Sequence, residues 1–389
     1  MGLDVARARR DTPGCETVAH LNNAGAALPP RVVTDAVIAH LRLEARIGGY
    51  EAAAQAAEAV DGTYTAIARL INCRVDEVAV VENATRAWDM AFYSLPVAAG
   101  DRILTSSAEY ASNAIALLQV AQRTGARVEV VDDDEHGQLD VRDLERRLDG
   151  TVKLVAVTHV PTHGGLVNPA AAIGRLTKAA GVPFLLDACQ SVGQLPVDVA
   201  AVGCDLLSAT GRKFLRGPRG TGFLYVSAEL AARLQPPFLD LHSATWEAPE
   251  RYSVVAGARR FETWEGNVAA KIGLGVAVDY ATSWGLPDIA AQVGDVARLL
   301  RSRLGEHAGV TVHDHGEHLC GIVTFSVRGV GSADVAGRLR AAGVNTSVTT
   351  AANSRFDPLA TENLVRASVH YYNTAEEIDR LCAALPAPK

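Results

Sequence analysis

The sequence contains very little lysine. Only five of its 37 basic residues are lysines, and the other 32 are arginines. Genomic codon bias accounts for such a preference, since arginine can replace lysine on most solvated surfaces. A lysine inside a conspicuous motif of this chain is nevertheless a strong candidate for a chemical role. The five are Lys153, Lys178, Lys213, Lys271 and Lys389.

Paired cysteines and long apolar runs are also missing. None of the six cysteines forms a C-x-x-C pair, which argues against a zinc ribbon or a disulfide scaffold. No stretch reaches the roughly 18 apolar residues of a membrane helix, and the first ten residues lack the apolar core of a secretory signal. The net charge of −7 disfavours a nucleic-acid-binding surface. We therefore expect a cytoplasmic protein without nucleic-acid or membrane partners.

The chain does have an ordinary globular composition and the length for more than one core. Its 389 residues are 48% hydrophobic and 21% charged, which excludes wholesale disorder. At roughly 150 residues per domain, this length predicts two domains, with three as the alternative. We expect an N-terminal arm at 1–20, a large domain at 21–285 and a small C-terminal domain at 286–389.

Short apolar runs alternate with helical patterns between about residues 60 and 226. Nearly continuous apolar strands separated by helices are typical of a sheet that is covered on both faces. We predict a doubly wound α/β fold with a large mixed sheet, followed by a smaller α+β domain. The predicted strands are 102–107, 127–132, 153–160, 183–190, 205–211, 220–227, 321–327 and 364–372. In such folds, functional loops gather at the carboxyl ends of the strands.

Two of these loops carry candidate ligands for an anionic, ring-shaped cofactor. The segment Asn83-Ala84-Thr85-Arg86 opens a predicted helix, whose N-terminal N–H groups suit a phosphate; an ordinary N-cap is the alternative. Asp187 closes an apolar strand and would be costly to bury without a partner. A protonated pyridinium nitrogen is one such partner, while an arginine or a backbone cap is the alternative. Gln190 could reach a ring hydroxyl.

Lys213 lies in the Gly-rich segment 210–222, 26 residues after Asp187. A partly desolvated lysine among cations has a lowered pKa and can form a Schiff base. Thr210 and Arg212 could complete the phosphate site, although a basic surface turn is the alternative. Tyr110, after another strand, could stack on a ring or be a buried structural residue.

In combination, these loops resemble the class V aminotransferase family, fold type I enzymes that depend on pyridoxal 5′-phosphate (PLP). The resemblance extends from LNNAGAALPP (21–30) to RASVHYYNTAEEID (366–379) and includes LLDACQSVGQLPVDV and TGRKFLRGPRGTGFLYV. It implies that Lys213 forms the Schiff base and shuttles the α-proton, and that Asp187 pairs with the pyridinium nitrogen. It also implies cofactor contacts from Ala84, Thr85, Arg86, Tyr110, Thr162, Gln190, Thr210, Arg212 and Asn267. Implied substrate contacts are Arg366, as the α-carboxylate clamp, with Asn23, Tyr50 and His163, and a homodimer is implied as well.

Three departures from the family pattern matter. Arg212 stands where many relatives have histidine, and Trp264-Glu265 replaces a Gly-Thr pair that contacts the neighbouring subunit's phosphate. Cysteine desulfurases of this family need a cysteine on a mobile loop before the carboxylate-binding arginine. The corresponding stretch, 343–365, contains no cysteine, which disfavours desulfurase chemistry.

Features near Tyr50, Trp264 and 345–348 resemble the branch of isopenicillin N epimerase-like proteins and ergothioneine-type C–S lyases. The expected reaction is C–S β-elimination from an S-substituted cysteine or its sulfoxide, which could serve natural-product biosynthesis. It would release a thiol or sulfenate with pyruvate and ammonia. The alternatives are an aminotransferase, an epimerase or a decarboxylative deaminase, or a non-catalytic or metal-binding protein of this fold. We expect no metal at the His-rich segment 313–318, and a structural hydrogen bond remains the alternative for His163.

Overall fold

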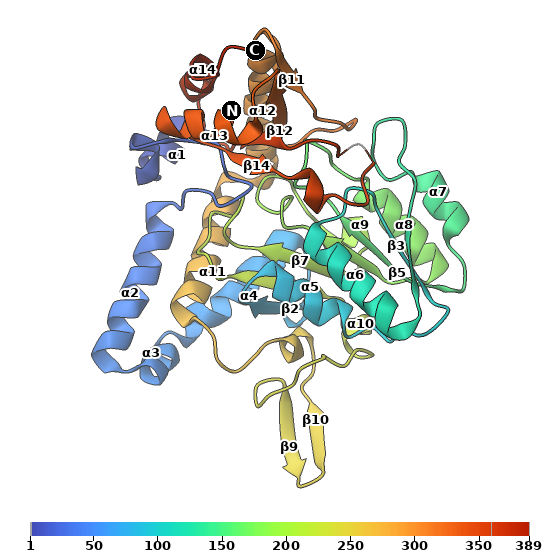
Figure 1. Ribbon diagram of the computed structural model, residues 1–389. Coiled ribbons are helices and arrows are strands. Elements are labelled where there is room, and N and C mark those ends of the chain that lie inside the picture. The colour runs from blue at the N-terminus through green and yellow to red at the C-terminus, as the bar shows by residue number, and fades with distance from the viewer. Residues whose placement is uncertain (1, 359, 389) are drawn as a thin grey trace.

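The computed structural model describes residues 2–358 and 360–388 (Figure 1). Its centre is a seven-stranded mixed sheet in the order β2-β8-β7-β6-β5-β3-β4. Strand β8 is antiparallel to its neighbours β2 and β7, and the other pairs are parallel. The strands are β2 (Val78–Val81), β3 (Arg102–Thr105), β4 (Arg127–Val130), β5 (Val152–Thr158), β6 (Phe184–Asp187), β7 (Leu206–Thr210) and β8 (Gly222–Val226).

Helices cover both faces of this sheet, as the continuous apolar strands predict (Figure 1). In β6, Phe184 and Leu186 pack into one hydrophobic cluster and Leu185 packs into another, so successive side chains face two cores. The helices of this part of the chain are α2 (Arg31–Ile47), α3 (Gly49–Gln55), α4 (Ala57–Ile71), α5 (Ala84–Phe92), α6 (Ala111–Thr124), α7 (Val141–Arg147), α8 (Ala170–Ala180), α9 (Val199–Val202), α10 (Ala228–Ala231) and α11 (Val268–Trp284), with 3-10 turns η2 (Val75–Glu77) and η3 (Ala258–Phe261).

A smaller antiparallel sheet follows, in the order β11-β12-β15-β14, and confirms the predicted α+β unit. Its elements are α12 (Leu286–Gly305), β11 (Val310–Val312), β12 (Ile322–Val327), α13 (Ser332–Ala341), β13 (Val344–Asn345), β14 (Ser347–Thr349), η4 (Ala351–Asn353), β15 (Leu364–Ser368) and α14 (Ala375–Ala383). No helix within the described residues is both long and apolar enough to span a bilayer.

The N-terminal segment packs on this smaller unit (Figure 1). Its elements are α1 (Val5–Arg10), η1 (Pro13–Glu16) and β1 (Ala19–His20). Strand β1 pairs with β13, and Arg9 of α1 forms an ion pair with Glu377 of α14 at 2.9 Å. The domain boundaries at 20 and 285 stay a prediction.

The loop-rich stretch after β8 contains a hairpin that the sequence did not reveal. Strands β9 (Ala244–Ala248) and β10 (Arg251–Val254) are antiparallel and project from the body of the molecule (Figure 1). Their side chains are mostly exposed, so the burial pattern that identifies the other strands is missing here.

Gly193 supports the loop that carries Lys213. Its φ of +96° suits glycine, and a Cβ at this position would lie 2.4 Å from the carbonyl carbon of Phe214. We expect Gly193→Ala to lower the free energy of unfolding by about 2–4 kcal/mol, because it adds both strain and a clash.

Urea denaturation measures this change. Gly62→Ala is the control, since Gly62 lies in α4 with no heavy atom near its would-be Cβ. That substitution should stabilise the protein by about 0.5–1 kcal/mol. Equal midpoints for the two variants would contradict the packing argument.

Candidate active site

A cavity of about 430 Å³ opens where the strands of the large sheet end. The loops that follow β2, β3, β5, β6 and β7 all contribute to it, as a doubly wound fold requires. Its lining includes these predicted site residues: Ala84, Thr85, Tyr110, Thr162, Asp187, Gln190, Thr210, Arg212 and Lys213. Asn83, Asn113, Thr158, Val160 and Cys189 complete the wall.

Asp187 is held rigidly at the end of β6. The residue is 5% exposed, and each carboxylate oxygen accepts one hydrogen bond at 2.9 Å. Oδ2 accepts from the side-chain amide of Asn113, and Oδ1 accepts from the backbone N–H of Cys189. An ionised carboxylate oxygen can accept a further hydrogen bond, so Asp187 can still bind a protonated ring nitrogen in the cavity.

Lys213 follows β7 and shares the cavity with Asp187. Burial lowers the pKa of its ammonium group. Cys189 and Asp187 oppose this shift, while Arg212 and Arg366 reinforce it. A lysine in such surroundings is more readily deprotonated than one at the surface, which is the condition for attack on a carbonyl.

The cavity wall fits an anionic ring with a hydroxyl group. Among the described residues, Lys213, Arg212 and Arg366 form no ion pairs with carboxylates, so anionic ligands would relieve their mutual repulsion. The Oε1 atom of Gln190 is buried and has no hydrogen-bond partner, whereas its Nε2 donates to the Ala24 carbonyl. A ring hydroxyl would supply the missing donor. These features match the phosphate, the ring nitrogen and the hydroxyl of PLP.

The N-terminus of α5 forms one end of the cavity. Asn83 caps this helix by accepting a hydrogen bond from the backbone N–H of Arg86 at 2.8 Å, and Ala84 and Thr85 line the cavity. The Arg86 guanidinium points elsewhere, over the ring of Phe238 at 4.9 Å. The helix thus offers backbone N–H groups to a phosphate rather than the Arg86 side chain.

Arg366, on β15 of the small sheet, lies beside the cavity and contacts Thr162 of its wall. It is 8% exposed, its Nη1 donates to the Thr162 hydroxyl, and its Nη2 donates to Asn22 Oδ1 at 3.5 Å. Burial, with Arg212 as the next contributor, lowers the pKa of Arg366 to about 10. Its buried Nε has no hydrogen-bond partner. A carboxylate is the ligand that this guanidinium lacks.

Three more predicted residues, in addition to Arg86, are absent from the cavity wall. Asn23 is fully buried, and its amide is used by contacts with His20, Ser368 and Tyr372. The neighbouring Asn22, which was not predicted, contacts Arg366 instead. The other two are Tyr50, 74% exposed on α3, and Asn267, which caps α11.

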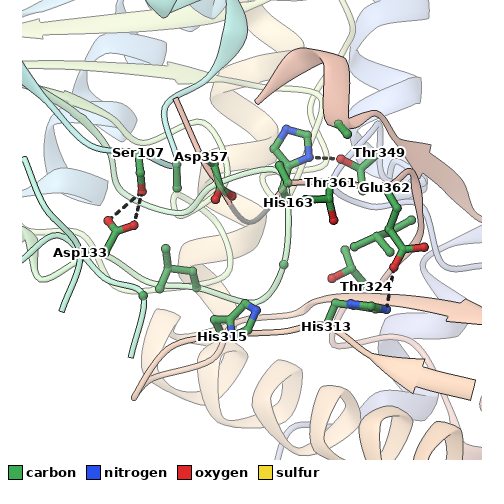
Figure 2. A pocket seen from close by; sticks show the side chains of 17 residues that line it. Ser107, Asp133, His163, His313, His315, Thr324, Thr349, Asp357, Thr361 and Glu362 are labelled. Atoms are coloured by element: carbon green, nitrogen blue, oxygen red, sulfur yellow. Dashed lines mark hydrogen bonds and ion pairs between the residues drawn. The ribbon is translucent and has the colours of Figure 1, made fainter. Parts of the chain in front are cut away.

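The structure contains a second cavity, of about 120 Å³, whose lining Figure 2 shows. Thr162 lines the larger cavity and His163 the smaller one, and Thr324, which pairs with Arg366 across β12 and β15, also lines the smaller one. Figure 2 shows His163 directed at Thr349, with Asp133 and Ser107 on one side and His313 near Glu362 on the other. Within the described residues, no group of three His, Cys, Asp or Glu side chains is arranged to hold a metal ion.

Sequence reasoning assigned no role to Glu109, Asn113 or Cys189. Glu109 and Asn113 are buried, and Asn113 contacts Asp187 directly. The sequence did contain one indication of their role. Glu109 and Asn113 are four residues apart and follow an apolar strand, a spacing that brings two side chains to the same side of a helix start. Burial raises the pKa of the Cys189 thiol well above its ordinary value, with Asp187 as the next cause.

Known proteins resemble this chain along almost its whole length. A "Probable cysteine desulfurase" of Methanothermobacter thermautotrophicus is 31% identical over 381 residues, which cover 96% of this chain and 95% of the relative. The apo structure of the cysteine desulfurase from Thermococcus onnurineus NA1 superposes with a TM-score of 0.90 at 26% identity, covering 98% and 97% of the two chains. A complex of the cystine C–S lyase C-DES with cysteine persulfide has the same fold, with a TM-score of 0.86 at 22% identity, covering 97% of this chain and 100% of the other.

The sequence model of the family "Aminotransferase class-V" matches residues 19–381. This range contains every strand of both sheets and the whole wall of the larger cavity. The chain therefore belongs to the class-V aminotransferase family of PLP-dependent enzymes.

Proposed function

We propose that this enzyme is a C–S β-lyase that acts on an S-substituted cysteine or its sulfoxide. One observation carries the proposal: Lys213 lines the cavity and Arg366 donates to Thr162 of its wall, while the stretch 343–365 beside Arg366 has no cysteine that could accept sulfur. The arrangement suits removal of an α-proton but offers no thiol for sulfur transfer.

PLP held in this cavity would supply an electron sink for the pair that remains when an α-proton leaves the substrate. Lys213 accepts that proton on its Nζ, because burial lowers the pKa of its ammonium group and favours the neutral amine. Asp187 would hold the ring nitrogen in its protonated form, and Tyr110, the N-cap residue of α6, lines the same cavity and would stack on the ring.

Arg366 binds the α-carboxylate through N–H groups that include its unpartnered Nε, and Asn22 and Thr162 hold the guanidinium in place. His163 stays neutral at physiological pH, because burial lowers the pKa of its imidazole to about 4, and Arg366 adds to the shift. It therefore acts as a hydrogen-bonding group for the substrate and not as the acid that protonates the leaving group.

Sulfur leaves together with its own substituent. The thiolate is the nucleophilic form of cysteine, and Cys189, the cysteine that lines the cavity, has a strongly raised pKa that disfavours it. Breaking the Cβ–S bond therefore yields a thiol, or a sulfenate from a sulfoxide, and hydrolysis of the remaining three-carbon unit gives pyruvate and ammonia. The overall reaction takes up one water molecule.

The smaller cavity provides room for the substituent on sulfur. Three carboxylates and three imidazoles are among its lining residues, including Asp133, Glu362, His313 and His315 (Figure 2). These groups offer hydrogen-bond partners to a polar substituent. We expect this enzyme to work in the cytoplasm; that location and a role in natural-product biosynthesis stay predictions.

Product analysis tests the reaction. With S-conjugated cysteines we expect pyruvate, ammonia and thiol in equal amounts and no carbon dioxide, with a higher kcat/KM for polar substituents than for apolar ones. Mass spectrometry should find no sulfur added to any cysteine of the protein. Carbon dioxide without pyruvate would instead show decarboxylative deamination, and persulfide formed from free cysteine would show desulfurase activity.

The attachment site is tested by borohydride reduction of the PLP-loaded protein. Peptide mapping should find the reduced cofactor on Lys213, because its amine is the one that lines the cavity. Lys213→Ala should abolish the covalent label and turnover, while Lys271→Ala should keep the label. A label on Lys271 or Lys178 would refute the assignment.

We also propose that the enzyme is a homodimer whose second copy completes the site. Large apolar side chains are exposed on α2, α3 and the β9–β10 hairpin, including Leu41, Tyr50 and Trp246. Single exposed apolar residues are ordinary, but a group of this size suits an interface. Tyr50 and Asn267 lie outside their own cavity and would contribute across the dimer.

Leu41→Arg tests the interface. Leu41 is 48% exposed on α2, so the substitution should spare the fold but convert the dimer to a monomer, because it would bury an unpaired charge. Sedimentation velocity measures the change. Val75→Arg, at a residue 41% exposed in η2, is the control and should leave the dimer intact. A monomeric wild-type protein would overturn this proposal.

A further inference from the structure

A second buried carboxyl group lies behind Asp187, outside the cavity wall. Glu109 is 4% exposed in the loop between β3 and α6. Its Oε1 accepts hydrogen bonds from the backbone N–H of Tyr110 at 2.7 Å, from the Asn113 amide at 2.9 Å and from the Thr158 hydroxyl. Its Oε2 accepts from the Thr105 hydroxyl at 3.0 Å. These neutral donors hold the carboxyl group in a single place.

Asn113 connects this carboxyl group to Asp187. Its Nδ2 donates to Glu109 Oε1 and to Asp187 Oδ2, both at 2.9 Å. An amide nitrogen has two hydrogens, so each carboxylate takes one. Turning the amide over would direct its carbonyl oxygen at both acceptors, which is repulsive. Glu109 thus fixes the Asn113 orientation on which one of the two hydrogen bonds to Asp187 depends.

Glu109 also places a titratable charge beside Asp187. Burial raises the pKa of Glu109 to about 7; the Thr158 hydrogen bond opposes this shift and the charge of Asp187 adds to it. Its contacts from β3, β5 and α6 are Thr105, Thr158 and Asn113, none of them charged, and Asp187 is the charged group that faces it from β6. No described residue forms an ion pair with Glu109.

We propose that Glu109 is a positioning residue for the cofactor: through Asn113 it orients Asp187 toward the ring nitrogen, and its charge adds to that of Asp187 behind the ring. A negative charge there favours the protonated cofactor. When pH falls below about 7, Glu109 takes up a proton and this contribution is lost. The inference rests on PLP binding in this cavity and is independent of the substrate, so it can fail while the C–S lyase assignment holds, and the reverse.

Glu109→Gln tests the charge. The substituted glutamine can keep every contact of Glu109, because its carbonyl oxygen accepts where Oε1 does and its amide nitrogen donates to the Thr105 hydroxyl. The measurement is the visible absorbance of the PLP-loaded protein between about pH 5.5 and 9. We expect the pH midpoint of the absorbance change to fall by about half a unit or more, because the protonated cofactor loses a stabilising charge.

Glu377→Gln is the matched control. Glu377 is a buried carboxyl group that accepts hydrogen bonds from Arg9 and Asn373, and it does not line the cavity. The Glu377→Gln variant should therefore keep the wild-type midpoint. A Glu109→Gln midpoint equal to that of the wild type would overturn the proposed role of the charge.

Glu109→Ala, Asn113→Ala and the double variant test the connection. The measurement is the Kd of PLP for each apoprotein at pH 8, with circular dichroism as the check on folding. Each single substitution should weaken binding by about tenfold, on the scale of one lost hydrogen bond to a charged group. The double variant should be no more than about threefold weaker than either single variant, because both break one chain of contacts. The proposal would be overturned if the fold-increase in Kd of the double variant equalled the product of the two single increases. It would also be overturned if the single variants bound PLP as tightly as the wild type.

Discussion

Unpaired positive charge around the cavity is the constraint on which the rest of the structure depends. Lys213 and Arg212 line it, Arg366 contacts Thr162 of its wall, and Asp187 is the carboxylate in that wall. Burial lowers the pKa values of Lys213 and Arg366, and the charges of their neighbouring arginines lower them further. A phosphate and a substrate carboxylate would neutralise the positive charge of this site.

Holding the cations in place requires a firm scaffold, and Arg216 supplies part of it. This arginine is 1% exposed and lies three residues after Lys213 in a left-handed conformation, with φ of +60°. Its guanidinium donates to the Leu28 carbonyl at 2.8 Å and to the Tyr371 hydroxyl at 2.6 Å, and it lies 4.6 Å from the ring centre of Tyr372. One side chain thereby ties the lysine loop to the N-terminal segment and to the chain that follows β15.

Contacts of the N-terminal residues with the smaller sheet explain how Arg366 comes to lie beside a cavity that the loops of the large sheet form. Asn22 bridges to Ser368 beside the end of β15, and β1 pairs with β13, so the N-terminal segment joins the smaller sheet. Asn22 then contacts the Arg366 guanidinium directly. The N-terminal segment therefore pairs with β13 of the smaller unit shortly before Asn22, the residue that contacts Arg366.

Much of this arrangement could be predicted, for reasons that particular residues illustrate. Asp187, Thr210 and Lys213 follow apolar strands, and the strand pattern alone places such residues at one edge of a parallel sheet. The choice between Asn22 and Asn23 could not be predicted, because a loop has no period that says which side chain faces inward. Arg86 was expected to contact the cofactor, yet its guanidinium lies over the ring of Phe238, which is distant in sequence.

The sequence by itself determined the alternation of strands and helices, the family and the residues that bring charge to the strand ends, since periodicity and local residue type carry that information. Only the tertiary structure decided which charges are buried together and which are paired. Glu109 and Asp187 are 78 positions apart, and nothing local predicts that Asn113 would donate to both. Burial and hydrogen-bond partnership depend on atoms from β3, β5, β6 and α6 at once, and these meet only in the folded chain.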